Sequence, residues 1–176
     1  MASYKLKGLE EYEKVLSGIA GAAEKGELAG AAIYAGADVV ADAIRGGIRE
    51  LPEVDHRKRG TAGAQLDGIT SAQKEGLLEG FGITPMRNDN GLFNVKLGFD
   101  GYNKVKTKRW PSGQPNAMIA RSVNSGTSFR KKTRFVDIAA KKAKPEAEKA
   151  MAEAFDGKLE EMLKEMEQQA EQTPAN

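Results

Sequence analysis

The chain has 176 residues, of which 30% are charged, and its formal net charge at pH 7 is +2. The absence of cysteine excludes disulfides, cysteine nucleophiles and thiolate zinc sites, and a single histidine excludes polyhistidine metal sites. Apolar residues make up only 40% of a chain whose length suits one domain, and many of them are alanine, so we expect a thin core that neighbouring subunits help to stabilise.

The first third of the chain predicts two helices. After a short extended start at 4–7, apolar residues three and four positions apart predict an amphipathic helix over about 9–24, which ends at Glu24-Lys25-Gly26. A second helix is predicted over about 27–50, because Pro52 disfavours helix at the preceding residue. Residues 53–69 are polar and rich in glycine and charge, so we expect a long mobile loop there.

The remaining elements are short until the C-terminus. A short helix is predicted over about 71–79, and Asn90-Gly91 between two β-prone runs, 81–86 and 92–99, predicts a hairpin. A second mobile loop near 103–116 contains Trp110, which we expect to anchor it to the core. Helices are then predicted over about 117–124 and 135–170, and Pro145 either kinks the last helix or begins a new one.

Together these elements predict one α+β domain over residues 1–170. It would contain two N-terminal helices, a small antiparallel β-sheet with a central hairpin, a short helix and a long C-terminal helix. Residues 171–176 are predicted to be a frayed tail.

The charge is strongly segregated along the chain. Residues 101–134 contain no acid and nine bases, and residues 145–176 have a net charge of −6. The basic residues, which we expect to line a subunit interface or a DNA channel, are Lys104, Lys106, Lys108, Arg109, Arg121, Arg130, Lys131, Lys132 and Arg134. The acidic residues that we expect to form an interface on the last helix are Glu146, Glu153, Glu160 and Glu161. Three interpretations of the basic segment stay open: a solvated loop, a contact with the acidic surface of a neighbouring copy, or a contact with nucleic-acid phosphates.

The sequence lacks the motifs that carry common chemistries. It has neither a phosphate-binding G-x-x-x-x-G-K-[ST] loop nor a G-x-S-x-G nucleophile motif. His56 lies beside Asp55 in a charged loop and is expected to be solvated, since two neighbouring residues are not a catalytic constellation. Asn88-Asp89-Asn90-Gly91 has no glutamate where a calcium loop needs one, so it indicates a hairpin turn. We therefore expect no enzyme activity, no cofactor and no metal, and no membrane partner, because no apolar run approaches the length of a span.

Two motifs carry a family resemblance that covers about residues 5–165. Lys5-Leu6-Lys7-Gly8-Leu9-Glu10-Glu11 is similar to the opening of the head–tail joining or tail-completion proteins of long-tailed bacteriophages, the tenth-gene-product family. The segment 120–128 is similar to the one that follows the sheet in that family, keeping Val123 and Gly126-Thr127-Ser128. The chain departs from the family in the stretched segment after Pro52, and in Asn124 and Ser125, which replace an acid and an aromatic residue.

The resemblance implies a non-enzymatic structural virion protein. It would assemble as a homo-oligomeric ring at the head–tail junction or tail top, complete the tail and join it to the capsid connector. Its partners would be copies of itself and the connector, tail terminator or tail tube proteins, and the basic loops would face either protein or DNA in the channel. It would be found in the virion, and in the host cytoplasm during assembly. The alternative is a nucleic-acid-binding module that uses residues 101–134.

Overall fold

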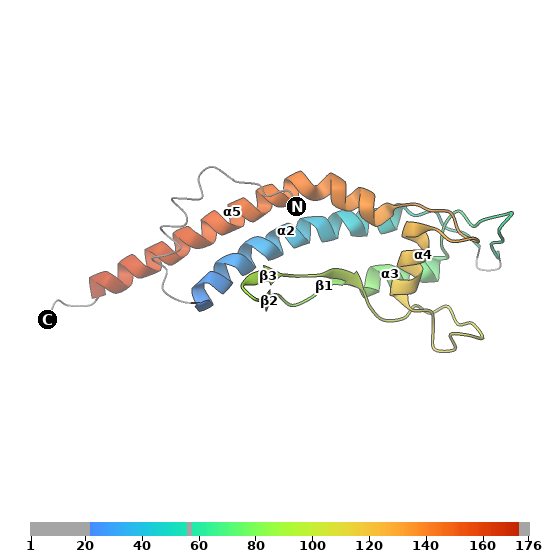
Figure 1. The fold of residues 1–176 in the computed structure, drawn as a ribbon, viewed down its shortest axis with the longest axis horizontal. Helices are drawn as coiled ribbons and strands as arrows, with labels where there is room; N and C mark the ends of the chain where they lie inside the picture. Colours follow the sequence, from blue (N-terminus) through green and yellow to red (C-terminus); the bar gives the residue numbers. More distant parts are fainter. Residues whose placement is uncertain (1–21, 56–57, 173–176) are drawn as a thin grey trace.

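The fold is built around two long antiparallel helices, α2 (Ala22–Glu50) and α5 (Phe135–Gln172), as Figure 1 shows. The computed structural model describes residues 22–55 and 58–172. A long β-hairpin and two short helices, α3 (Ser71–Gly80) and α4 (Asn116–Ser125), lie along one side of this pair. The described chain is thus a mixed arrangement of helices and antiparallel strands, which agrees with the predicted α+β class.

Small residues let α2 and α5 approach each other closely. Gly36 faces Met151, and a Cβ atom at this position would collide with the Cγ atom of Met151. The larger core cluster joins the C-terminal half of α2 to the start of α5, with Ile44, Ile48 and Phe135 buried within it. A smaller cluster at the other end packs Leu28 against Leu159 and Met162.

The predicted boundary between the first two helices is wrong. Residues 24–26 lie inside α2, which is a single helix from Ala22 to Glu50. Glycine is a weak helix former, but tertiary packing overrides such preferences, and here Gly26 lies against the ring of Phe93 while Leu28 is buried. The predicted strand at 4–7, the rest of the helix at 9–24, and His56 lie outside the described residues.

The long C-terminal helix is confirmed, and Pro145 lies inside it rather than at the start of a new helix. Proline removes one backbone N–H donor from the helical ladder. Figure 1 shows that the axis of α5 changes direction within the orange part of the helix.

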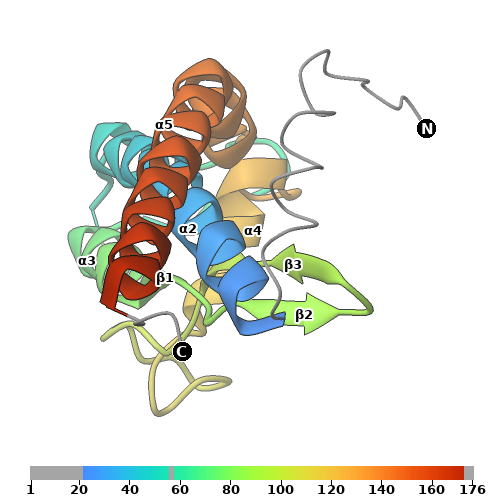
Figure 2. The same ribbon diagram turned by 90° about the vertical axis from the view of Figure 1, so that its left-hand side faces the viewer.

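The predicted hairpin is also confirmed, as two short antiparallel ladders. Strand β1 (Phe81–Ile83) pairs with β4 (Leu97–Phe99), and β2 (Arg87–Asp89) pairs with β3 (Leu92–Asn94). The turn has positive φ at Asn90 (56°) and Gly91 (89°), as a two-residue hairpin turn of the mirror-image type requires. Figure 2 shows β2 and β3 beside the N-terminal part of α2.

Aromatic rings tie the base of the hairpin to the core. The ring centroids of Phe81 and Phe99 are 4.9 Å apart, and those of Phe99 and Phe135 are 6.3 Å apart. The first pair is tilted and the second is edge-to-face, and aromatic pairs at such distances stabilise the fold beyond the apolar area that they bury. The hairpin is therefore fixed to the end of the helix pair where α5 begins.

The two predicted short helices are confirmed as α3 and α4, and Gly76 of α3 lies against Asn116, the first residue of α4. Helix α3 begins with a capping box in which Thr70 and Gln73 exchange side-chain and backbone hydrogen bonds. A Cβ atom on Gly76 would collide with the Cβ atom of Asn103 and lie 2.8 Å from Oδ1 of Asn116. Asn116 in turn donates from Nδ2 to the carbonyl oxygen of Asp100 at 2.8 Å.

Backbone hydrogen bonds cross the segments that the sequence predicts to be mobile loops. Val54 donates to the carbonyl oxygen of Ile69 at 2.9 Å, and Leu66 donates to that of Phe129 at 2.9 Å. Asn103 donates to the carbonyl oxygen of Gln114 at 2.9 Å, which closes the second loop at its base. Each loop thus leaves from a hydrogen-bonded base, and the mobility of its tip stays a prediction.

The substitution Gly76→Ala tests the contact between α3 and the 100–116 segment. The added methyl group has no room beside Asn103, so we expect a loss of about 1–3 kcal/mol in the free energy of unfolding. Gly157→Ala in α5 is the matched control, since no atom lies within 4 Å of its added Cβ atom. There the same change should gain up to about 1 kcal/mol from helix propensity. Urea denaturation measures both; equal effects would contradict the packing described.

Candidate interaction surface

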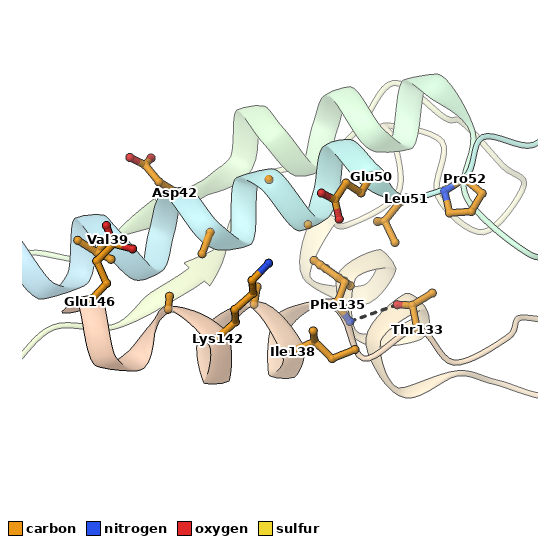
Figure 3. Close-up of a pocket in the computed structure, with 15 residues that line it drawn as sticks. Val39, Asp42, Glu50, Leu51, Pro52, Thr133, Phe135, Ile138, Lys142 and Glu146 are labelled. Atoms are coloured by element: carbon orange, nitrogen blue, oxygen red, sulfur yellow. Dashed lines mark hydrogen bonds between the residues drawn. The ribbon is translucent and has the colours of Figure 1, made fainter. Parts of the chain in front are cut away.

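A groove with a volume of about 720 Å³ lies between α2 and α5 (Figure 3). Val39, Asp42 and Glu50 line it from α2, and Ile138 and Lys142 line it from α5. The charged side chains that line the groove come from different helical turns, and Asp42 forms an ion pair with Arg45 at 2.9 Å. Within the described ranges, no three His, Cys, Asp or Glu side chains converge as metal ligands. The groove therefore offers an apolar floor with a charged rim, which suits contact with another polypeptide.

The basic segment lies at the end of the molecule where α5 begins, as its loops in Figure 1 show. Three of the predicted basic residues are paired with acids on their own chain. Lys104 lies 3.0 Å from Glu75, Lys131 lies 2.9 Å from Asp67, and Arg134 lies 3.6 Å from Asp137. The hydrogen bond from Lys104 to Glu75, together with the charge of that acid, raises the pKa of Lys104.

Arg130 is not on the exposed surface that the sequence predicts for it. Only 5% of the residue is exposed, and its Nη1 donates to the carbonyl oxygen of the buried Gly68. Its Nε has no partner within the described part of the chain, and burial lowers the pKa of the guanidinium. The guanidinium of arginine nevertheless stays protonated inside proteins. Arg130 therefore joins residues 66–68 to residues 127–130 from inside.

Five basic residues remain exposed at this end and make no ion pair within the described part of the chain. We call this set the basic end: Lys106, Lys108, Arg109, Arg121 and Lys132. The guanidinium carbon of Arg109 lies 5.7 Å from the ring centroid of Trp110. Trp110 is half-buried but belongs to neither core cluster, and it exchanges backbone hydrogen bonds with Thr107 at 3.0 Å. It stabilises the turn of its own loop.

The four predicted acidic residues all lie exposed on α5. Glu153 is 3.6 Å from Lys149 and Glu161 is 2.9 Å from Lys158, and the bond to Glu161 is the main cause of the raised pKa of Lys158. Glu160 and Glu146 make no ion pair within the described ranges, and Glu146 stands at the edge of the α2–α5 groove. We call Glu153, Glu160 and Glu161 the acidic end.

The two ends are far apart along the longest axis of the molecule. Helix α5 begins at the basic end and carries the acidic end towards the opposite extremity (Figure 1).

No protein-family model, curated protein or solved structure matches the chain. Within the described ranges, no helix combines the length and apolar character needed to cross a membrane.

Sequence reasoning missed the burial of Arg130 because no local pattern separates it from Lys131 and Lys132. Its environment depends on a segment more than 60 positions earlier, whose glycine carbonyl accepts its hydrogen bond. Three consecutive cations, Arg130, Lys131 and Lys132, predict a solvent-exposed segment, and only the long-range hydrogen bond shows that the first of them is buried.

Arg130→Met tests this internal role against the matched neighbour Lys131→Met. Losing a charged donor leaves the carbonyl of Gly68 unpaired, so we expect a loss of about 1.5–3 kcal/mol in unfolding free energy for the first change. Lys131 and Asp67 form an exposed pair, so the second change should cost less than about 1 kcal/mol. Denaturant melts of both variants measure the difference, and a larger cost at Lys131 would refute the assignment.

Proposed function

We propose that the chain is a non-enzymatic structural subunit, which joins copies of itself head to tail in a ring at the neck or tail top of a long-tailed phage. The observation that carries the proposal is the separation of charge: the five free cations of the basic end lie opposite a C-terminal segment of net charge −6. The motifs at 5–11 and 120–128, which resemble the tail-completion family, supply the phage context.

The placement of the charges favours a particular kind of contact. The two patches differ in sign and lie at opposite ends, so the basic end of one copy is complementary to the acidic end of another. A head-to-tail contact pairs them, and repeated head-to-tail contacts close into a ring when the rotation allows it. Opposed potentials also speed encounter and fix register.

Apolar residues near these charges would supply contact area in such an assembly. Ile138 is 59% exposed at the α2–α5 groove, and Leu163 is 40% exposed between the acids of α5. In the proposed ring these side chains become buried against the next copy, while the outer faces meet the connector, the tail terminator or the tail tube. The subunit would then reside in the virion after assembly in the host cytoplasm.

Charge reversal tests the ring contact. Changing Lys106, Lys108 and Arg109 to Glu, or Glu153, Glu160 and Glu161 to Lys, should abolish oligomers that wild-type chain forms alone or with connector and tail proteins. Mixing the two variants should restore assembly, because one then carries acids at both ends and the other bases. Light scattering at low and high salt measures this.

The matched control reverses three exposed cations away from the basic end: Lys25, Arg87 and Lys96 to Glu. This change alters net charge equally and should leave assembly intact. A wild-type chain that stays monomeric with every connector and tail protein would refute the ring.

A nucleic-acid contact is the second candidate. The observation that favours it is the pairing of Arg109 with the half-buried ring of Trp110 beside free lysines, since cations and aromatic rings together bind single strands without sequence preference. The basic end would then face DNA in the channel of the ring, or bind nucleic acid independently of any ring.

The salt dependence of DNA binding separates these possibilities. Each phosphate contact contributes about 0.9 to the slope of log affinity against log salt, so changing Lys106, Lys108 and Arg109 to Gln should lower that slope by up to about 3. Lys104→Gln is the control, because Glu75 already pairs with this lysine. Fluorescence anisotropy with labelled DNA measures the slope; no binding at low salt would remove this candidate.

A further inference from the structure

A second groove lies on the opposite side of α2, where the hairpin and α5 flank it. Its volume is about 570 Å³. We call it the hairpin groove; its apolar lining includes Ile33, Val40, Val95, Leu97, Ala147 and Met151. Ile33, Val40, Val95 and Leu97 are only half-buried, so the groove is an apolar surface left open by the described residues. An apolar segment lying in the groove would bury these side chains further.

We propose that this groove binds the first 21 residues of the same chain, through Leu6, Leu9 and Tyr12. The first argument is reach. Helix α2 begins at Ala22, so Ile33 and Val40 lie about 16 and 27 Å further along it at the helical rise of ~1.5 Å per residue. If residues 19–21 form the turn, a helix over 9–18 that returns alongside α2 spans about 15 Å, which brings Leu9 about level with Ile33.

The residues before that helix reach the rest of the groove. An extended chain advances about 3.3 Å per residue, so Leu6 lies about 10 Å beyond Leu9. This brings Leu6 level with Val40, at the far end of the groove. The length of chain before Ala22 thus matches the length of the groove.

The chemistry of the segment matches the groove as well. Leu9, Tyr12 and Leu16 form one apolar face at helical spacing, and Glu13 lies beside that face. The edge of the groove on α5 carries Lys141, Lys144 and Glu148, and Lys144 lies 3.6 Å from Glu148, so Lys141 is the cation that faces no acid among the described residues and is opposite in charge to Glu13. Covalent connection gives the segment an effective concentration in the millimolar range, so even weak apolar contacts would hold it there.

This docking does not depend on ring formation, because both partners are parts of one chain.

Paired cysteines test the docking in the full-length chain, which contains no cysteine of its own. Val40 lines the hairpin groove and the adjacent Val39 lines the groove on the other side. Leu6→Cys combined with Val40→Cys should form an intramolecular disulfide at least about tenfold faster than Leu6→Cys combined with Val39→Cys. Mass spectrometry and non-reducing gels follow the rate under a mild oxidant.

A second pair, Leu9→Cys with Ile33→Cys, repeats the test at the near end of the groove and covers the case in which Val40→Cys disturbs the core. Fast intramolecular links in either pair support the proposal. Equal rates with Val39 and Val40, together with no fast link in the second pair, would overturn it. Links found only between two chains would also overturn it, since the occupant would then be the segment of another copy.

Discussion

The close antiparallel approach of α2 and α5 is the constraint on which the rest of the molecule depends. It requires small residues on both helices, as the contact of Gly36 with Met151 and the buried Ala41, Ala139 and Ala143 show. The larger cluster of buried side chains lies at one end of the pair, and a small one around Leu28 lies at the other. In the larger cluster, Phe135 and Ile48 pack with residues of the hairpin base and of α4, so the short elements lie at that end.

This asymmetry determines where the charges go. The chain passes from the hairpin to α5 through residues 100–134, and both ends of that passage are fixed at the core end of the helix pair. Asn116 fixes the first part to Asp100, and Arg130 fixes the second part to Gly68. The free cations of this passage therefore project from one extremity. Helix α5 then carries its acids away from them, and the near-neutral total conceals two separated charges.

Much of this arrangement could be predicted from local signals. The Asn90-Gly91 turn, Pro52 after α2 and the apolar periodicity of α5 act over a few residues, so the hairpin and the helix end near them were identified correctly. The helix end predicted at Gly26 was wrong because this part of α2 packs against Phe93, a residue far along the chain. The paired state of Lys104 and the burial of Arg130 likewise depend on partners that no sequence window contains. Long-range pairing separates the free cations from those that stabilise the fold.

The thin core and the open grooves have one physical cause. Alanine and glycine bring two helices together but cover little surface beyond the contact itself, so a pair built from them leaves a groove on each side. Burial of apolar area is the main stabilising term in folding, and the apolar side chains that line each groove still expose part of their surface. If both proposals hold, the chain would gain stability by filling its grooves, from its own N-terminal segment on one side and from another polypeptide on the other. Assembly would then complete the core rather than add to a finished one.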